Sequence, residues 1–324
     1  MRGGYFNTET QRHRVFLSRG IKPLCLCVSV LKIVPSFLLS FLIACGAGVQ
    51  VSCANEDNPA GQQGTYSGVP LIIFDTDIGS STDDLFALEM LYRYEQQGAC
   101  KLLGVVVDRE GEDCAAVADV MNNYFGHAST PIGLVRKGIP APAVWIDYKS
   151  LPTYTNDDGG LMFRRSVDDY SALPDGWQLY RRLLSRQPDF NFGQGITFAQ
   201  DFFRLWPQDV DMVFSPGEVG DPIEYTPEQV VSDISWTDIH PIKQVYMTCD
   251  CNTGQKMWDT LPVIQAVEGD GVFSLSARGT VSITWSAETF FTPSPTGNCR
   301  YQLPGTAEWV AQILEKIRRA NRQR

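Results

Sequence analysis

The sequence predicts an α/β protein built on an open, mostly parallel β-sheet. From residue 69 onward, apolar runs of strand length alternate with amphipathic runs of helix length, a rhythm typical of right-handed crossovers between parallel strands. The chain has 324 residues, of which 44% are hydrophobic, and this is enough apolar material for one large core. The first strand ends in a run of carboxylates, at the sheet edge where such folds bind ligands.

The predicted elements begin with a buried strand at residues 71–74, because "LIIF" is a continuous apolar run. A helix follows, in which four apolar residues recur at helical spacing: Leu85, Leu88, Leu91 and Tyr92. Ser81 or Thr82 stands where this helix needs a cap. The same pattern predicts a strand at 102–107, a helix at 115–124 and a strand at 130–135. Together these elements predict a Rossmann-like sheet.

The second half of the chain continues with weaker signals. We expect helices at 176–186 and 198–207 and a strand at 210–215. The last helix, within residues 306–324, has one apolar face: Val310, Ile313, Leu314 and Ile317. Its basic end suits the negative end of the helix dipole.

The first 55 residues are typical of an export signal. Basic residues precede a long apolar stretch that is interrupted by Lys32 and Pro35, and "LIACG" resembles a bacterial lipobox with Cys45 as the lipidated residue. A plain membrane helix is the alternative. We therefore predict a signal and lipoprotein segment at 1–55, a flexible linker at 56–68 and one domain at 69–324. The protein is expected to be exported and anchored by lipid, facing the periplasm or the cell exterior.

The charge of the chain indicates the kind of partner. A formal net charge of -10 argues against nucleic-acid binding, which needs clustered Lys and Arg. A small polar molecule is the expected ligand. The sequence leaves open whether the chain forms a homo-oligomer.

The stretch "FDTDIGSSTDD" places four carboxylates within ten positions: Asp75, Asp77, Asp83 and Asp84. A helix dipole stabilises each acid in its first turn by only about 0.3–1 kcal/mol. Two unit charges about 4 Å apart repel by roughly 4 kcal/mol at an effective dielectric constant near 20. The loop must therefore hold protons or a cation, and a hard divalent ion bound through oxygen fits, with Gly79 allowing a tight turn. An acid-capped helix with solvated carboxylates remains the alternative.

Four stretches resemble the inosine/uridine-preferring nucleoside hydrolases. "DTDIGSSTDDLFAL" is similar to the amino-terminal D-x-D-P-G-x-D-D signature of that family, and "LLGVVVDREGE", "FNFGQGITFAQDFF" and "WDTLPVIQAVEGDGVFSLS" follow in the family's order. The resemblance implies a calcium ion that holds the ribose hydroxyls and a water, which an aspartate activates. By position, Asp77 is that base and a calcium ligand, and Asp84 and Asp259 are further ligands. Asp83 and Asn191 correspond to ribose-binding residues.

The chain departs from the family pattern near the site. Ile78 replaces the usual proline, and three residues instead of one separate Gly79 from Asp83, so the loop is two residues longer. Trp258 stands where many members have a histidine that assists the departing base. Trp258 can stack on a nucleobase but cannot donate a catalytic proton, and a core aromatic is the equal alternative.

A larger departure follows the helix at 176–186. The chain runs straight into "FNFGQGI", where the family has a strand with a carbonyl ligand, a helix and another strand, so that about fifty residues of a central βα unit are missing. Asp189 either ends the helix or replaces a ribose-binding glutamate. We therefore expect weak calcium binding and little or no hydrolysis, as in a truncated or degenerate relative.

The function implied by the resemblance is hydrolysis of the N-glycosidic bond of ribonucleosides to ribose and free base, as in purine and pyrimidine salvage. The runner-up is a non-catalytic nucleoside- or sugar-binding lipoprotein. A phosphohydrolase with an aspartyl nucleophile is weaker, because no Lys or Arg lies between Phe74 and Tyr92. Glu110 or Glu112 can enter the pocket from the next strand or lie in solvent. We expect the ring of His240 to be satisfied by neighbouring backbone, with a catalytic histidine as the less favoured alternative.

Overall fold

The computed structural model describes the backbone of three strands before residue 34, and then residues 69–79, 81–139, 146–184, 206, 208–249, 251, 253–284 and 289–323. Cys45, Asn191, the linker at 56–68 and the junction where a βα unit was expected to be missing lie outside these residues. The expectations placed on them stay predictions. Within the described residues, no helix is both long and apolar enough to cross a membrane.

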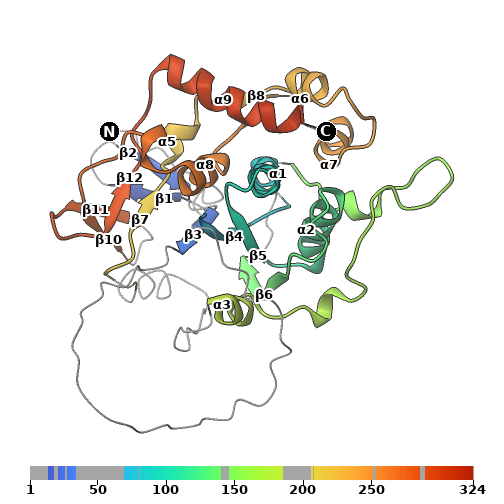
Figure 1. Cartoon of the computed structure of the whole chain (residues 1–324), viewed down its shortest axis with the longest axis horizontal. Helices are drawn as coiled ribbons and strands as arrows, with labels where there is room; N and C mark the ends of the chain where they lie inside the picture. The colour runs from blue at the N-terminus through green and yellow to red at the C-terminus, as the bar shows by residue number, and fades with distance from the viewer. Residues whose placement is uncertain are drawn as a thin grey trace, which may run out of the picture.

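The main sheet has the strand order β3 (Val28–Ile33), β4 (Leu71–Thr76), β5 (Lys101–Arg109) and β6 (Ile132–Ile139). β4, β5 and β6 are parallel, and β3 pairs with β4 in the antiparallel sense (Figure 1). The predicted parallel strands are thus confirmed, each within a few residues of its expected bounds. β3 comes from the segment expected to be a signal, and its removal would leave β4 at the edge of the sheet.

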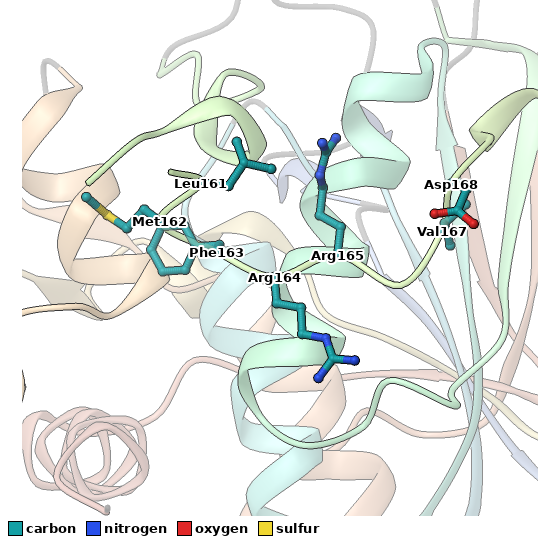
Figure 2. Close-up of a pocket in the computed structure, with 7 residues that line it drawn as sticks. All are labelled: Leu161, Met162, Phe163, Arg164, Arg165, Val167 and Asp168. Atoms are coloured by element: carbon teal, nitrogen blue, oxygen red, sulfur yellow. The ribbon is translucent and has the colours of Figure 1, made fainter. Parts of the chain in front are cut away.

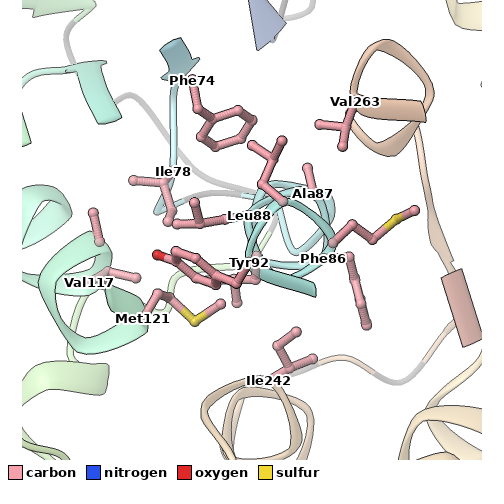
Figure 3. Packing of buried hydrophobic residues seen from close by; sticks show 14 of the residues in the cluster. Phe74, Ile78, Phe86, Ala87, Leu88, Tyr92, Val117, Met121, Ile242 and Val263 are labelled. Carbon is pink, nitrogen blue, oxygen red and sulfur yellow. The ribbon is translucent and has the colours of Figure 1, made fainter. Parts of the chain in front are cut away.

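Helices cover both faces of the three parallel strands. α1 (Asp83–Gln96) and α2 (Glu112–Tyr124) pack on the larger core, to which Phe74, Leu88 and Val117 contribute (Figure 3). α3 (Gly176–Leu184) covers the other face, where Leu179 contacts Ile73 and Val106.

Glycine in β6 permits the close approach of α3. A Cβ atom added to Gly133 would lie 2.9 Å from the Leu179 Cβ atom, so any larger residue would push the helix away from the sheet. This contact fixes the helix against the strands that carry the site residues.

The second half forms a smaller sheet with the strand order β11 (Thr289–Pro293), β10 (Gly279–Ile283), β12 (Cys299–Tyr301) and β7 (Met212–Phe214). Only the pair of β7 and β12 is parallel. The expected strand at 210–215 is therefore present, but the antiparallel strands were not predicted. They are three to five residues long, too short to show a distinct hydrophobic period.

In addition to three short 3-10 helices among the described residues, at Leu151–Thr153, Tyr170–Ala172 and Asp270–Val272, the other described strands and α-helices lie between and around the sheets. They are β1 (Arg14–Leu17), β2 (Ile21–Cys25), α5 (Gly217–Gly220), β8 (Glu224–Tyr225), α6 (Pro227–Asp233), α7 (Pro241–Thr248), β9 (Gln255–Lys256), α8 (Thr260–Glu268) and α9 (Ala307–Asn321). β1 pairs with β2, and β8 with β9. The predicted last helix is confirmed as α9, and its basic end binds Asp233 of α6 through Arg318 and Arg322.

Candidate functional site

Two carboxylates from one loop and a third from a distant part of the chain meet beyond the end of β4. Asp77 follows β4, Asp84 lies in the first turn of α1, and Asp259 precedes α8. One oxygen atom of each lies within 4.8 Å of the others, and all three residues are buried. These are the residues predicted as metal ligands, and three buried carboxylates at this spacing can hold a metal ion.

The position of Asp259 follows from the packing of α8 on α1. Leu261, Val263 and Ile264 of α8 are completely buried in the larger core, which fixes the start of that helix beside the start of α1. The Asp259 backbone N–H donates to Oδ2 of Asp83 over 3.2 Å. Two helix N-termini thus converge on one group of carboxylates, and their dipoles favour negative charge there.

Asp83 uses both carboxylate oxygens within the protein. Its Oδ1 accepts a hydrogen bond from the Ser81 hydroxyl, and its Oδ2 accepts the Asp259 N–H. Burial raises the pKa of Asp83 to about 6, although these hydrogen bonds oppose the shift. Its predicted contact with ribose stays a prediction.

Asp84 is completely buried. Burial raises its pKa well above the ordinary value, and the charges of Asp77 and Asp83 raise it further. Thr76 donates to Oδ1, whereas the buried Oδ2 atom has no hydrogen-bond donor among the described residues. A cation bound by Oδ2 would compensate the buried charge that a proton otherwise neutralises.

Arg109 binds the predicted base and was missed by the sequence analysis. It ends β5, is only 2% exposed, and its Nε donates to the Asp77 carbonyl oxygen over 2.8 Å. Its Nη2 donates to Asp77 Oδ2, also over 2.8 Å. The carboxyl ends of neighbouring parallel strands meet at one sheet edge, and this was the available signal. No Lys or Arg lies between Phe74 and Tyr92 in the sequence, but the fold brings Arg109 to Asp77, so a phosphohydrolase is no longer disfavoured on that ground.

Tyr148 holds the lengthened loop and was also missed. Gly79 has φ +121°, a conformation that other residues rarely adopt, and its N–H donates to the Tyr148 hydroxyl over 2.9 Å. That hydroxyl donates in turn to the Ser81 carbonyl over 2.5 Å. One buried side chain thus satisfies a backbone group just before the lengthened stretch, at Gly79, and one within it, at Ser81. The predicted cap is present as Thr82, but its hydroxyl lies 3.1 Å from the Tyr246 hydroxyl and makes no capping bond.

Trp258 is half-buried beside the triad. Its indole N–H lies 3.2 Å from the Gly217 carbonyl and 3.1 Å from Asp221 Oδ1. Gly220 is required at this contact, because a Cβ atom there would lie 2.4 Å from the indole ring. The indole N–H is directed towards α5 and the residue after it. The ring face can therefore still stack on a nucleobase, and a packing role is equally compatible with these contacts.

Asp75, the first carboxylate of the motif, lies on the other face of the sheet. Strand alternation places it beside Ile73, and the Tyr180 hydroxyl of α3 donates to its Oδ2 over 2.6 Å. Burial raises the pKa of Asp75 to about 6. Burial and then the charge of Asp75 raise the pKa of Asp108, on the adjacent strand, well above the ordinary value. The four clustered acids are thus divided between two environments.

The remaining candidates lie away from the triad. Glu110 and Glu112 are exposed, in accordance with the solvated alternative. The expectation for His240 is wrong, because its buried ring has no hydrogen-bond partner among the described residues. Aromatic rings of Tyr124, Phe125 and Trp236 surround it instead, and burial lowers its pKa to about 3.

An open surface pocket of about 540 Å³ is formed by residues 161–168 (Figure 2). The side chains that line it are Leu161, Met162, Phe163, Arg164, Arg165, Val167 and Asp168. None of them was predicted to belong to the site, and the buried carboxylates lie elsewhere. This pocket therefore contributes nothing to the chemistry of the triad.

No protein-family model and no curated protein matches the sequence. Among solved structures, the chain is similar to an inosine-uridine preferring nucleoside hydrolase from Bacillus anthracis, with a TM-score of 0.54 and 13% identity over 78% of this chain and 98% of the other. It is also similar to an inosine-guanosine nucleoside hydrolase, with a TM-score of 0.53 and 13% identity over 77% of this chain and 98% of that one. The chain therefore has the nucleoside hydrolase fold.

Proposed function

We propose that this chain is a calcium-assisted N-glycosyl hydrolase that cleaves ribonucleosides to ribose and free base. The observation that carries the proposal is the meeting of Asp77, Asp84 and Asp259 in a chain with the nucleoside hydrolase fold. The names of the two similar proteins suggest inosine, guanosine and uridine as first substrates to test. The sequence alone led us to expect weak calcium binding and little or no hydrolysis. Because Asp77, Asp84 and Asp259 meet through described parts of the fold that lie outside the segment after Pro188, we propose instead that the chain is active.

The donor set fits a hard divalent cation. Three buried carboxylates offer only oxygen, and calcium takes six to eight oxygen ligands in an adaptable geometry. The buried Oδ2 atom of Asp84, without a donor among the described residues, is the clearest position for a ligand bond. When bound by Asp77, Asp84 and Asp259, calcium would supply the positive charge that attracts the ribose hydroxyls.

Asp77 is proposed to act as the general base. It would accept a proton from a water whose oxygen forms a bond to the anomeric carbon as the bond from that carbon to the base nitrogen breaks. The surrounding carboxylates favour the positive charge that develops on the sugar in the transition state. Asp83 and Asn191 are proposed to bind sugar hydroxyls.

Trp258 is proposed to stack on the nucleobase. Its N–H is already directed to Gly217 and Asp221, so its contribution would be binding through the ring face. The departing base would then take its proton from another source, such as solvent.

Measurement of both binding and turnover separates this function from its alternative. The purified chain is incubated with inosine, guanosine or uridine, with calcium or with a chelator, and free ribose is quantified while calorimetry records nucleoside binding. Calcium-dependent release of ribose supports the hydrolase. Binding without release supports the non-catalytic nucleoside- or sugar-binding protein, and neither binding nor release rejects both proposals.

We also propose that the protein is exported and anchored by lipid. A lipidated Cys45 would place the domain at the outer side of a membrane, where a hydrolase can release bases from external nucleosides. This location is independent of the chemistry of the triad.

A further inference from the structure

The guanidinium of Arg109 places a permanent positive charge in the buried carboxylate group. Four buried acids surround the site, namely Asp77, Asp83, Asp84 and Asp259, with exposures of 5%, 1%, 0% and 3%. Arg109 is hydrogen-bonded to one of these acids, Asp77. Because an arginine remains charged at any working pH, this compensation does not depend on a bound ion.

The contact fixes the orientation of Asp77 as well as its charge. Nε and Nη2 of one planar guanidinium bind the main-chain carbonyl and the side-chain carboxylate of the same residue, each over 2.8 Å. The bond from Nε to the carbonyl holds the planar guanidinium in place relative to the Asp77 backbone, so the bond from Nη2 fixes the direction of the Asp77 carboxylate. Gly79 packs against the same region: a Cβ atom there would lie 2.9 Å from Cys114 Sγ, too close without a shift, and at an ordinary contact distance of 3.6 Å from Arg109 Cδ.

We propose that Arg109 is a positioning residue that acts as a built-in counterion, holding Asp77 in place without metal and weakening the affinity of the triad for a divalent cation. The inference rests on the proposed function only for the choice of calcium as the ion. Arg109 shares Asp77 with the triad, so its charge repels a second cation at the same carboxylate. The group therefore stays assembled in the metal-free protein, and calcium binds more weakly than three free carboxylates would bind it.

Three variants separate this role from ordinary packing. Arg109→Gln removes the charge and Arg109→Lys keeps it while losing the two-point contact. Arg93→Gln breaks another buried arginine pair, in which Arg93 lies 3.5 Å from Glu89 on α1, outside the site. Calcium affinity is measured by calorimetry and metal-free stability by thermal unfolding, so neither readout requires nucleoside turnover.

We expect Arg109→Gln to lower the metal-free melting temperature and to tighten calcium binding by about tenfold, because an uncompensated carboxylate replaces an ion pair. Arg109→Lys should lower the melting temperature with calcium affinity near that of the wild type. Arg93→Gln should lower stability and leave calcium affinity unchanged.

Unchanged or weaker calcium binding by Arg109→Gln would overturn the inference. If that variant does not fold, Arg109→Lys decides: affinity near the wild-type value supports the counterion role, and a tenfold tighter affinity contradicts it. If the variants show the expected order of calcium affinities while the wild type releases no ribose, that result would support this inference and reject the proposed hydrolase.

Discussion

The backbone N–H of Asp259 donates to Oδ2 of Asp83, and this 3.2 Å bond joins two residues that are 176 positions apart in the sequence. It links the first turn of α1 to the residue before α8 and so brings Asp84 and Asp259 to the same point. The site is therefore made by the packing of two helix N-termini, with Asp77 supplied by the strand that precedes the first of them.

Replacement of Asp84 tests the triad as a metal centre. Asp84→Asn removes a buried carboxyl group, whose pKa is raised by burial well above its ordinary value. The amide that replaces it can still accept the hydrogen bond from Thr76. We expect the metal-free melting temperature to rise and the increase produced by calcium to disappear. Differential scanning calorimetry with and without calcium measures both effects.

The matched control for this variant is Asp168→Asn, which changes an exposed carboxylate in the surface pocket. It should leave both the melting temperature and the calcium effect as in the wild type. A full calcium effect in Asp84→Asn would remove Asp84 from the metal centre.

The stability of the metal-free chain should fall as pH rises. Burial raises the folded-state pKa of Asp75 and Asp83 to about 6 and that of Glu89 to about 7. The folded chain therefore keeps protons that the unfolded chain releases near pH 4, and stability is lost as pH rises through the folded values. The urea concentration at the midpoint of unfolding should fall as the pH is raised from about 4 to about 8, and this fall should be smaller when calcium is present.

Glu89→Gln isolates the part of this pH dependence that comes from a residue outside the site. Because Glu89 has the highest of these three values, this variant should lose mainly the upper part of the pH dependence. Stability that increases with pH in the metal-free wild type would show that these acids are charged in the fold.

Tyr148→Phe tests the support of the lengthened loop. The change leaves the Gly79 N–H and the Ser81 carbonyl without their shared partner, and a buried group without a hydrogen bond costs about 1–3 kcal/mol. We expect a lower free energy of unfolding and weaker calcium binding. Tyr154→Phe is the control, since its hydroxyl binds Thr248 in a more exposed contact, and a smaller effect is expected there. Equal effects of the two changes would show that Tyr148 has no special role in supporting the site.

The strands and acids near the start of the domain could be predicted because their signals are local. The apolar run at 71–74 and the helical spacing after Asp83 gave β4 and α1, and the resemblance added Asp259. The structure brings Asp77, Asp84 and Asp259 together, as expected for ligands of one ion, while the identity of the ion stays a prediction.

Arg109 and Tyr148 were missed because their roles depend on long-range packing. A single arginine at the end of β5 has no periodicity, and its partner becomes visible only when strands β4 and β5 are aligned. Tyr148 lies 69 residues from Gly79, in a segment without regular spacing. The antiparallel strands of the second sheet were missed for a different reason, because they are only three to five residues long.

The proposed lipid anchor is tested through Cys45. If Cys45 is lipidated, the wild-type protein should partition into detergent, and Cys45→Ser should release it or leave an uncleaved precursor. Phase separation followed by mass spectrometry of the amino terminus measures both. Equal partitioning of the two proteins would favour an ordinary signal peptide or a membrane helix.

The most direct test of the central claim is the rate of ribose release from inosine and uridine by the wild type, by Asp77→Asn and by Glu110→Gln. Asp77 is the proposed base, whereas Glu110 is an exposed acid one residue beyond Arg109. We predict calcium-dependent release by the wild type and by Glu110→Gln, and none by Asp77→Asn. Release that persists in Asp77→Asn, or no release by the wild type with calcium, would contradict the account.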